Sequence, residues 1–177
     1  EYRVLQNITH WREQADFPVE ILEDDRFYCS IDAFASWAEG RKQLRMEFFY
    51  RELRRHTGIL MQDGVPIGGQ WNYDSDNRKP PDKNVPVPAP TRFVPDAITE
   101  EVCQLVETEF ADHYGDLYPF SFATTHAQAE EVLQQFIAQR LVNFGSYQDA
   151  MRTGEPFMFH SHIGFYLNCG LLSPMPA

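Results

Sequence analysis

The segment from His160 to Gly164 carries side chains and backbone groups that could bind an anion. A hydroxyl and unpaired backbone N–H groups at the start of a helix attract negative charge, because the helix dipole is positive there. His160 and Ser161 are the expected side-chain donors, and the backbone at Ile163 and Gly164 would complete the site. The same residues also fit an ordinary helix N-cap at Ser161. A metal site at His160 and His162 is not favoured, because the sequence indicates neither a third ligand nor an extended backbone.

A second group of side chains with chemical potential is the basic stretch between Arg41 and His56. It holds six of the 15 Lys and Arg residues in a chain whose net charge is −11. An acidic chain as a whole repels nucleic acid and anionic membranes, so any contact with DNA phosphates must be local. The candidates for such contacts are Arg41, Lys42, Arg45, Arg51, Arg54 and Arg55.

Helical periodicity gives this stretch two faces, if it forms one helix from about Arg41 to Gly58. One arc is apolar and is expected to face the core: Met46, Phe49, Tyr50 and Leu53. The opposite arc carries arginines: Arg41, Arg45, Arg51 and Arg55. Leu44 and Phe48 share the arginine arc, which indicates a surface covered by another part of the protein. We therefore expect the arginines to serve packing between domains first and DNA second. The alternative is an ordinary charged surface helix.

Length and composition predict one or two compact units, since 43% of the 177 residues are hydrophobic. The three cysteines lie far apart and lack any zinc-binding spacing, which is typical of reduced thiols in a cytoplasmic protein. No apolar run reaches the length that spans a bilayer, and no signal-peptide pattern opens the chain. Because the chain begins at Glu1 rather than at Met, we expect it to be a piece of a longer polypeptide.

The first half of the chain is predicted to be mainly helical, with a short strand. A helix is expected over residues 4–14, followed by a strand at Phe17–Leu22, where apolar residues alternate. Such a helix and strand resemble the last unit of an α/β domain. A lone strand is not stable, so this segment needs partners outside this chain or a different conformation here. Ser30 or Asp32 is predicted to cap the next helix, which ends near Gly40.

The second half is predicted to be an extended connector followed by helices. Six prolines between residues 72 and 95 exclude a regular helix there. Thr99 is the expected cap of the next helix, whose period is set by Ile98, Val102, Leu105, Val106 and Glu109. A capping box at Thr125–Gln128 predicts another helix that ends between Asn143 and Gly145, with Phe136 and Arg140 among its inner residues. Shorter helices are expected at residues 147–151 and 161–169.

Several motifs together form a specific pattern: Trp37-Ala-x-Gly40-Arg-Lys, Met46-Glu-Phe-Phe-Tyr50-Arg-Glu and Gly68-Gly-Gln-Trp71-Asn-Tyr-Asp74-x-x-Asn77-Arg-Lys79. Two more follow: Phe144-Gly-Ser-Tyr-Gln-Asp-Ala-Met151 and His160-Ser-x-Ile-Gly-Phe-Tyr-Leu-Asn-Cys-Gly170-Leu-Leu. With these motifs the chain resembles the photolyase-related proteins of prokaryotes, the iron–sulfur bacterial cryptochromes and (6-4) photolyases.

The resemblance implies a fold and a domain organisation. The fold is expected to be mainly α, with a helical connector, the start of an all-helical FAD domain and a short α/β remnant at the N-terminus. Residues 1–25 would end the α/β antenna domain, residues 26–95 would form the connector, and residues 96–177 would begin the FAD-binding domain. The 4Fe–4S cluster and the antenna chromophore of the family would lie outside these residues, so no metal ligand is assigned here.

The resemblance also implies roles for individual residues. His160, Ser161, Ile163 and Gly164 are similar to the segment that holds the FAD phosphates in photolyases, although Gly164 stands where the wider pattern has Ser. By their position in the family, Tyr147 and Asp149 would line the same pocket; alternatively they are a packed Tyr and a surface Asp. Arg78 joins Arg41 and Arg45 as a candidate for DNA binding. No catalytic residue is assigned.

The function implied by the resemblance is light-driven, flavin-dependent repair of UV-induced pyrimidine lesions in DNA, with the rest of the polypeptide as a further partner. One alternative is a blue-light photoreceptor of the cryptochrome type without repair activity. Another is a non-catalytic helical interaction module.

Overall fold

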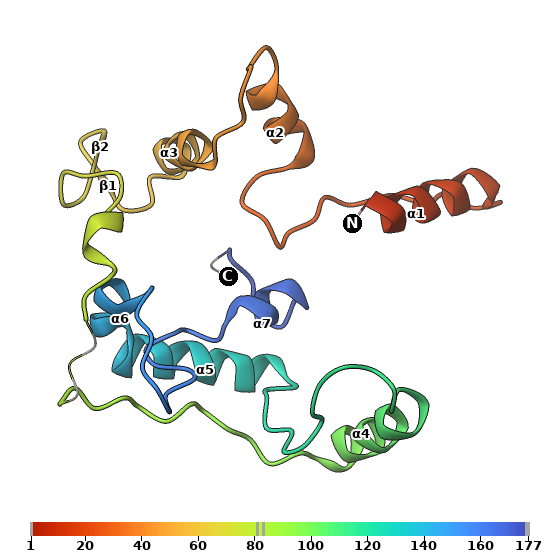
Figure 1. The fold of residues 1–177 in the computed structure, drawn as a ribbon. Coiled ribbons are helices and arrows are strands. Elements are labelled where there is room, and N and C mark those ends of the chain that lie inside the picture. Colours follow the sequence, from red (N-terminus) through yellow and green to blue (C-terminus); the bar gives the residue numbers. More distant parts are fainter. Residues whose placement is uncertain (1, 81, 83, 176–177) are drawn as a thin grey trace. The chain divides into compact units, whose positions relative to one another are not determined.

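The computed structural model describes residues 2–80, 82 and 84–175, which divide into two compact units (Figure 1). The first unit runs to Thr57 and includes the chain from Pro174 onward, and the second is Gly58–Ser173. The described residues form α-helices, long connecting segments and one two-stranded sheet, which confirms the mainly α prediction. The domain boundaries expected at residues 25 and 95 stay predictions.

The first unit contains helices α1 (Tyr2–Gln14), α2 (Ile31–Ala38) and α3 (Met46–Thr57). Ser30 caps α2 as expected, since its hydroxyl accepts a hydrogen bond from the backbone N–H of Ala33 at 3.1 Å. Gly40 follows α2 with a φ of 72°, a left-handed conformation that suits glycine after a helix end.

An aromatic cluster joins α2 to α3. Phe34 meets Phe49 edge to face at 5.1 Å between ring centres, and Trp37 lies 5.0 Å from the same Phe49 ring. Such pairs add about 0.5–1.5 kcal/mol to the effect of burial alone. Phe49 is therefore the main apolar contact of α3, as its place on the core-facing arc predicts.

Two predictions for the first unit are wrong. Residues 17–22 form no strand, because no described segment of the unit offers the hydrogen-bonding edge that a strand requires. The basic helix begins at Met46 rather than near Arg41, so Arg41 and Arg45 lie before it. Met46 and Tyr50 are exposed, and only Phe49 and Leu53 of the expected apolar arc are half-buried.

The second unit opens with a small hairpin. Strands β1 (Met61–Gln62) and β2 (Val65–Pro66) pair antiparallel around Asp63 and Gly64. Both turn residues have positive φ, 51° and 78°, as a tight two-residue hairpin turn requires. A 3₁₀ turn, η1 (Asp74–Asp76), follows, and the proline-rich described residues up to 95 are extended, as predicted.

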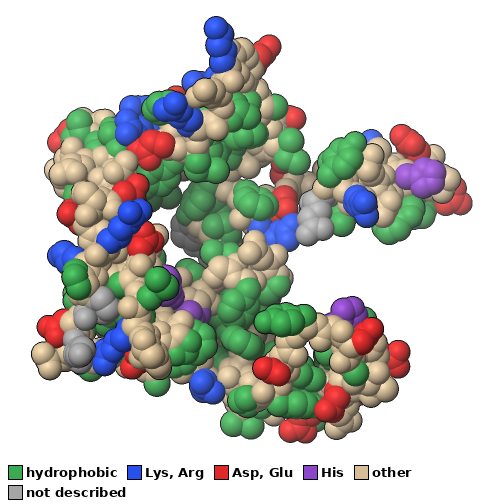
Figure 2. All heavy atoms as spheres, in the orientation of Figure 1, with side chains coloured by type: hydrophobic (Ala, Val, Ile, Leu, Met, Phe, Trp, Pro, Cys, Tyr) green, Lys and Arg blue, Asp and Glu red, His purple; other side chains and the backbone are tan. Residues whose placement is uncertain are grey.

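Helix α4 (Ala97–Glu109) is capped by Asp96 rather than by Thr99. The Asp96 carboxylate accepts hydrogen bonds from the backbone N–H and the hydroxyl of Thr99, at 2.8 and 2.7 Å, and these bonds lower the pKa of Asp96. The predicted apolar period is also turned outward: Ile98, Val102 and Leu105 are exposed, whereas Thr99 and Cys103 are buried. Figure 2 shows acidic and hydrophobic side chains side by side over α4.

Helices α5 (His126–Gln139) and α6 (Leu141–Tyr147) pack against each other and precede the short helix α7 (Gly164–Asn168) (Figure 1). The hydroxyl of Thr125 accepts from the backbone N–H of Gln128, which confirms the expected cap. In return the Gln128 side chain accepts from the N–H of Thr124, one residue before the position that a regular capping box uses.

The helix boundaries after α5 differ from the prediction. The residues Asn143–Gly145, expected to end a helix, lie inside α6, and residues 148–151 are not helical. The last helix is Gly164–Asn168, shorter than the 161–169 that we expected.

The core of the second unit forms around Tyr166, which is 2% exposed. It packs with buried Ala123, Ala129, Val132 and Leu172. The Tyr166 hydroxyl accepts a hydrogen bond from the buried N–H of Ala123 at 2.9 Å, and burial raises the pKa of this phenol. The core therefore joins α5 and α7 to the segment that precedes α5.

The cap of α5 can be tested with Thr125→Ala. Loss of the cap should lower the free energy of unfolding by about 1 kcal/mol, because the N–H of Gln128 loses its partner. Urea denaturation followed by circular dichroism measures this change. Thr125→Ser keeps the hydroxyl and should keep the stability; an equal loss in both variants would contradict the cap.

The hydroxyl of Tyr166 can be tested with Tyr166→Phe. This variant leaves a buried N–H without an acceptor, which should cost about 1–3 kcal/mol of unfolding free energy. Tyr114→Phe is the matched control, because Tyr114 is fully exposed. Equal stability of the two variants in urea denaturation would show that the Ala123–Tyr166 bond does not support the core.

Candidate functional site

The segment from His160 to Gly164 is an irregular loop held between buried anchors. Met158 and Phe159, each 3% exposed, fix its beginning, and Tyr166 fixes its end. The backbone N–H of His160 donates to the carbonyl of Phe157 at 3.1 Å. His160 is exposed and Ser161 is half-buried, so both side chains lie at the surface of a fixed support.

The structure decides against the alternative that Ser161 is an ordinary helix cap. The residue at the N-cap position of α7 is Ile163, and no side chain caps this helix. The space beside Gly164 is open, since a Cβ built there meets no atom within 4 Å. A serine at this position, as in the wider photolyase pattern, would fit without a clash.

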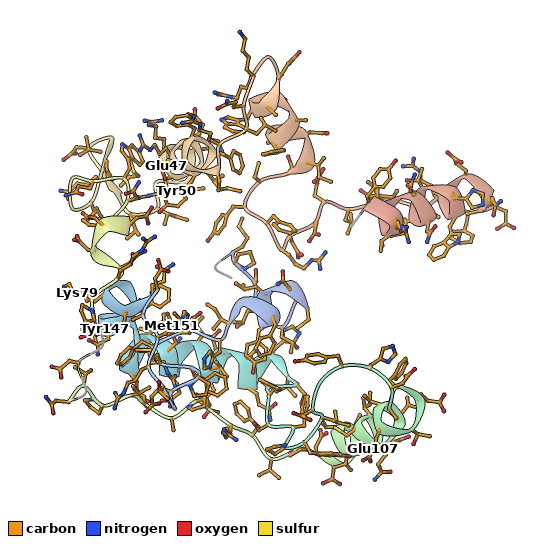
Figure 3. The ribbon with its side chains drawn as sticks, viewed as in Figure 1. Glu47, Tyr50, Lys79, Glu107, Tyr147 and Met151 are labelled. Carbon is orange, nitrogen blue, oxygen red and sulfur yellow. The ribbon has the colours of Figure 1, made fainter. Side chains whose placement is uncertain are left out.

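Tyr147 lies beside this segment through an aromatic contact. Its ring stacks on that of Phe159, with ring centres 5.4 Å apart and an interplanar angle of 29°. Figure 3 shows Tyr147 at the end of α6, with Lys79 nearby on the connector. The backbone N–H of Lys79 donates to the carbonyl of Ser146 at 3.2 Å, which ties the connector to α6.

Asp149 and Arg78, predicted to bind different ligands, form an ion pair with each other. Arg78 Nε lies 3.3 Å from Asp149 Oδ2, and the backbone N–H of Asp149 donates to the carbonyl of Asn77 at 3.2 Å. The Arg78 side chain is 76% exposed, so the pair adds little stability by itself. The pair does bring Arg78, on the connector, and Asp149, just after α6, next to each other.

Arg41 and Arg45 belong to the first unit and make local contacts there. The guanidinium of Arg41 lies 4.5 Å above the ring of Trp37, and its Nε donates to the Trp37 carbonyl at 2.6 Å. Arg45 lies 5.9 Å from the ring of Phe48 and donates from Nε to the side chain of Gln43. Both arginines remain exposed.

The cover expected over the arginine arc is not formed by the part of the chain that the structure describes. Leu44 and Phe48 are 57% and 47% exposed. Packing of this face on another domain therefore stays a prediction.

Sequence reasoning missed two polar residues in the interior of the second unit. Arg140 was placed on the inner side of its helix but given no role, and it is 1% exposed. Its Nε and the Nε2 of His162 are buried and find no hydrogen-bond partner among the residues that the structure describes. In the sequence, the core-facing helical position of this arginine could have indicated that Arg140 is buried. His162 carried no such signal, because its burial depends on tertiary structure.

Across residues 2–80, 82 and 84–175, no three or more His, Cys, Asp or Glu side chains come together as a metal site. All three cysteines are free thiols. None of the described helices has both the length and the apolar character to cross a bilayer.

The environment of His162 predicts a pH dependence of stability. Burial, the charge of Arg140 and the neighbouring His160 lower the pKa of His162 below its usual 6.5. The unfolded chain then binds more protons than the folded chain, so this contribution to stability is complete above pH 6.5 and is lost as the pH falls below that value.

Urea denaturation at several pH values measures this effect. His162→Asn, which tolerates the left-handed backbone at this position, should flatten the loss of stability below pH 6.5 relative to the parent chain. The exposed His10 provides the control variant His10→Asn, which should keep the parent profile. Identical profiles for all three proteins would contradict the role of His162.

Comparison with known proteins places the chain in a family. Residues 1–122 match the family described as deoxyribodipyrimidine photo-lyase-related protein. The chain is also 45% identical over 175 residues to a (6-4) photolyase of Agrobacterium fabrum. This match covers 99% of the chain but 34% of the relative, so the chain spans about a third of that protein. The chain therefore belongs to the deoxyribodipyrimidine photo-lyase-related proteins.

Proposed function

We propose that this chain is part of a flavin-dependent, light-driven DNA photolyase that repairs UV-induced pyrimidine lesions. The observation that carries the proposal is the 45% identity to a (6-4) photolyase along nearly the whole chain. The name of that relative favours the (6-4) class of lesion and favours repair over a purely signalling photoreceptor.

The segment His160–Gly164 has donors that fit the phosphates of FAD. The imidazole of His160, the hydroxyl of Ser161 and backbone N–H groups at Ile163 and Gly164 are suitable partners for phosphate oxygens. The open space beside Gly164 leaves room for a ligand close to the backbone. When bound and reduced, FAD would supply the electron for repair.

Tyr147 and Asp149 would bound the same pocket. The stacking of Tyr147 on Phe159 would hold one wall of this pocket in place beside the segment His160–Gly164. The ion pair with Arg78 offsets the charge of Asp149, which would otherwise repel an anionic cofactor.

Exposed arginines would contact the phosphates of damaged DNA. Arg41, Arg45 and Arg78 each present a guanidinium to solvent in a chain that is otherwise acidic. The lesion must leave the base stack to reach a flavin, so such contacts would position the duplex around it. The remaining two thirds of the polypeptide would complete the flavin pocket and carry the 4Fe–4S cluster and the antenna chromophore. A cytoplasmic location is part of the same proposal.

The FAD assignment can be tested in the full-length polypeptide with His160→Ala combined with Ser161→Ala. Each lost hydrogen bond to a charged phosphate is worth about 1.5–3 kcal/mol, so FAD affinity should fall by a factor of about 100 or more. Flavin absorbance of the purified protein and repair of a (6-4) lesion under blue light measure the two consequences.

Two control variants make this test specific. Gly164→Ser should retain FAD, because its side chain has open space. Ser75→Ala, in η1, should behave like the parent protein. Full flavin content in the double variant would contradict the phosphate site, and bound, photoreducible flavin without repair in the parent protein would contradict the photolyase function.

A further inference from the structure

Arg140 is a buried cation whose known partners are backbone carbonyls. It follows α5 and is 1% exposed. Its guanidinium donates to the carbonyl oxygens of Pro88 and Ala89, and its Nε–H has no acceptor among the described residues. Burial lowers the pKa of Arg140. A buried charge is costly unless a group of opposite charge compensates it, and none of the described acidic side chains forms an ion pair with Arg140.

His162 provides a second polar group without a partner. Its Nε2 is buried and makes no hydrogen bond to any described residue. A left-handed backbone, with a φ of 58°, sets its direction, and the ring of Phe157 meets its imidazole at 4.8 Å between ring centres. The charge of Arg140 is close enough to act on the pKa of His162.

Arg140 and His162 line the same cavity in the second unit. The cavity has a volume of about 350 Å³. Its other walls combine aromatic rings, among them Phe122, Phe165 and Tyr166, with aliphatic and polar residues that include the exposed cation Arg92. Phe122 and Phe165 support each other edge to face at 5.3 Å between ring centres. The volume lies within the range of sites that hold small organic molecules.

We propose that this cavity binds a small aromatic carboxylate. The carboxylate would accept hydrogen bonds from the guanidinium of Arg140 and from the Nε2–H tautomer of His162. The aromatic ring of the ligand would pack among the phenylalanines. This site is distinct from the proposed phosphate site, which uses His160, Ser161 and the backbone at the start of α7, and it does not depend on the proposed function.

The charge and the ring of the ligand make separate contributions to its affinity for the cavity. A neutral aromatic amide of the same shape would fill the cavity but leave the charge of Arg140 uncompensated. A carboxylate without a ring would meet the charge but leave the aromatic walls unfilled. Both the charge and the ring are therefore required for tight binding.

The test uses the full-length protein and isothermal titration calorimetry with benzoate, benzamide and acetate. Benzoate should bind at least about tenfold more tightly than either benzamide or acetate, the contribution expected of a charge-assisted hydrogen bond or of a buried ring. Arg140→Met should weaken benzoate binding by at least about tenfold and leave the weak binding of benzamide unchanged. Arg12→Met, on exposed α1, is the matched control and should bind benzoate as the parent does.

A second variant covers the case in which Arg140→Met does not fold. His162→Asn keeps the backbone conformation but is too short to reach the Nε2 position, so it should weaken benzoate binding several-fold. Absence of benzoate binding to the parent protein would overturn the proposal, as would equal affinity for benzoate and benzamide. Unchanged benzoate binding in both cavity variants would also overturn it.

Discussion

The second unit depends on the burial of Tyr166. One residue of the short helix α7 supplies a hydroxyl to the N–H of Ala123 and a backbone carbonyl to the N–H groups of Leu171 and Leu172. Tyr166 thereby joins Ala123, 43 residues earlier in the chain, to the turn that directly follows α7. A five-residue helix has little stability of its own, so α7 forms because Tyr166 is packed there. The burial of Tyr166 also positions the loop before α7, which carries His160 and Ser161.

Local signals predicted the parts of the fold that depend on neighbouring residues. Ser30 and Thr125 cap their helices because a hydroxyl needs only the next turn of backbone to act. Segments that need distant partners were predicted less well. Residues 17–22 alternate like a strand but have no edge to pair with. Thr99 was expected as a cap, although Asp96, three residues earlier, is the stronger acceptor and takes that role. The apolar side of α4 is exposed because burial depends on what packs against a helix, which its own period does not specify.

In the candidate site, too, local sequence patterns predicted some features, whereas others arise only from tertiary structure. The roles assigned to the motif around residue 160 stay predictions, and the structure adds that Ile163, not Ser161, stands at the N-cap position of α7. The pairing of Arg78 with Asp149 joins positions 71 residues apart, so no local pattern announces it. The nearness of Arg140 to His162 likewise arises only when α5 and the loop before α7 close around the cavity.

The positions of the cations in the second unit affect how the segment His160–Gly164 would bind an anion. Arg78 already has the carboxylate of Asp149, and the buried guanidinium of Arg140 lines the inner cavity together with His162. The segment His160–Gly164 would therefore bind phosphate mainly through short hydrogen bonds from a hydroxyl, an imidazole and backbone N–H groups. Interactions of this kind are short-ranged and depend weakly on salt, whereas exposed arginines act on DNA over longer distances and are screened by salt. At this proposed site, the fixed geometry of the donors, rather than net charge, would supply the affinity for an anionic cofactor.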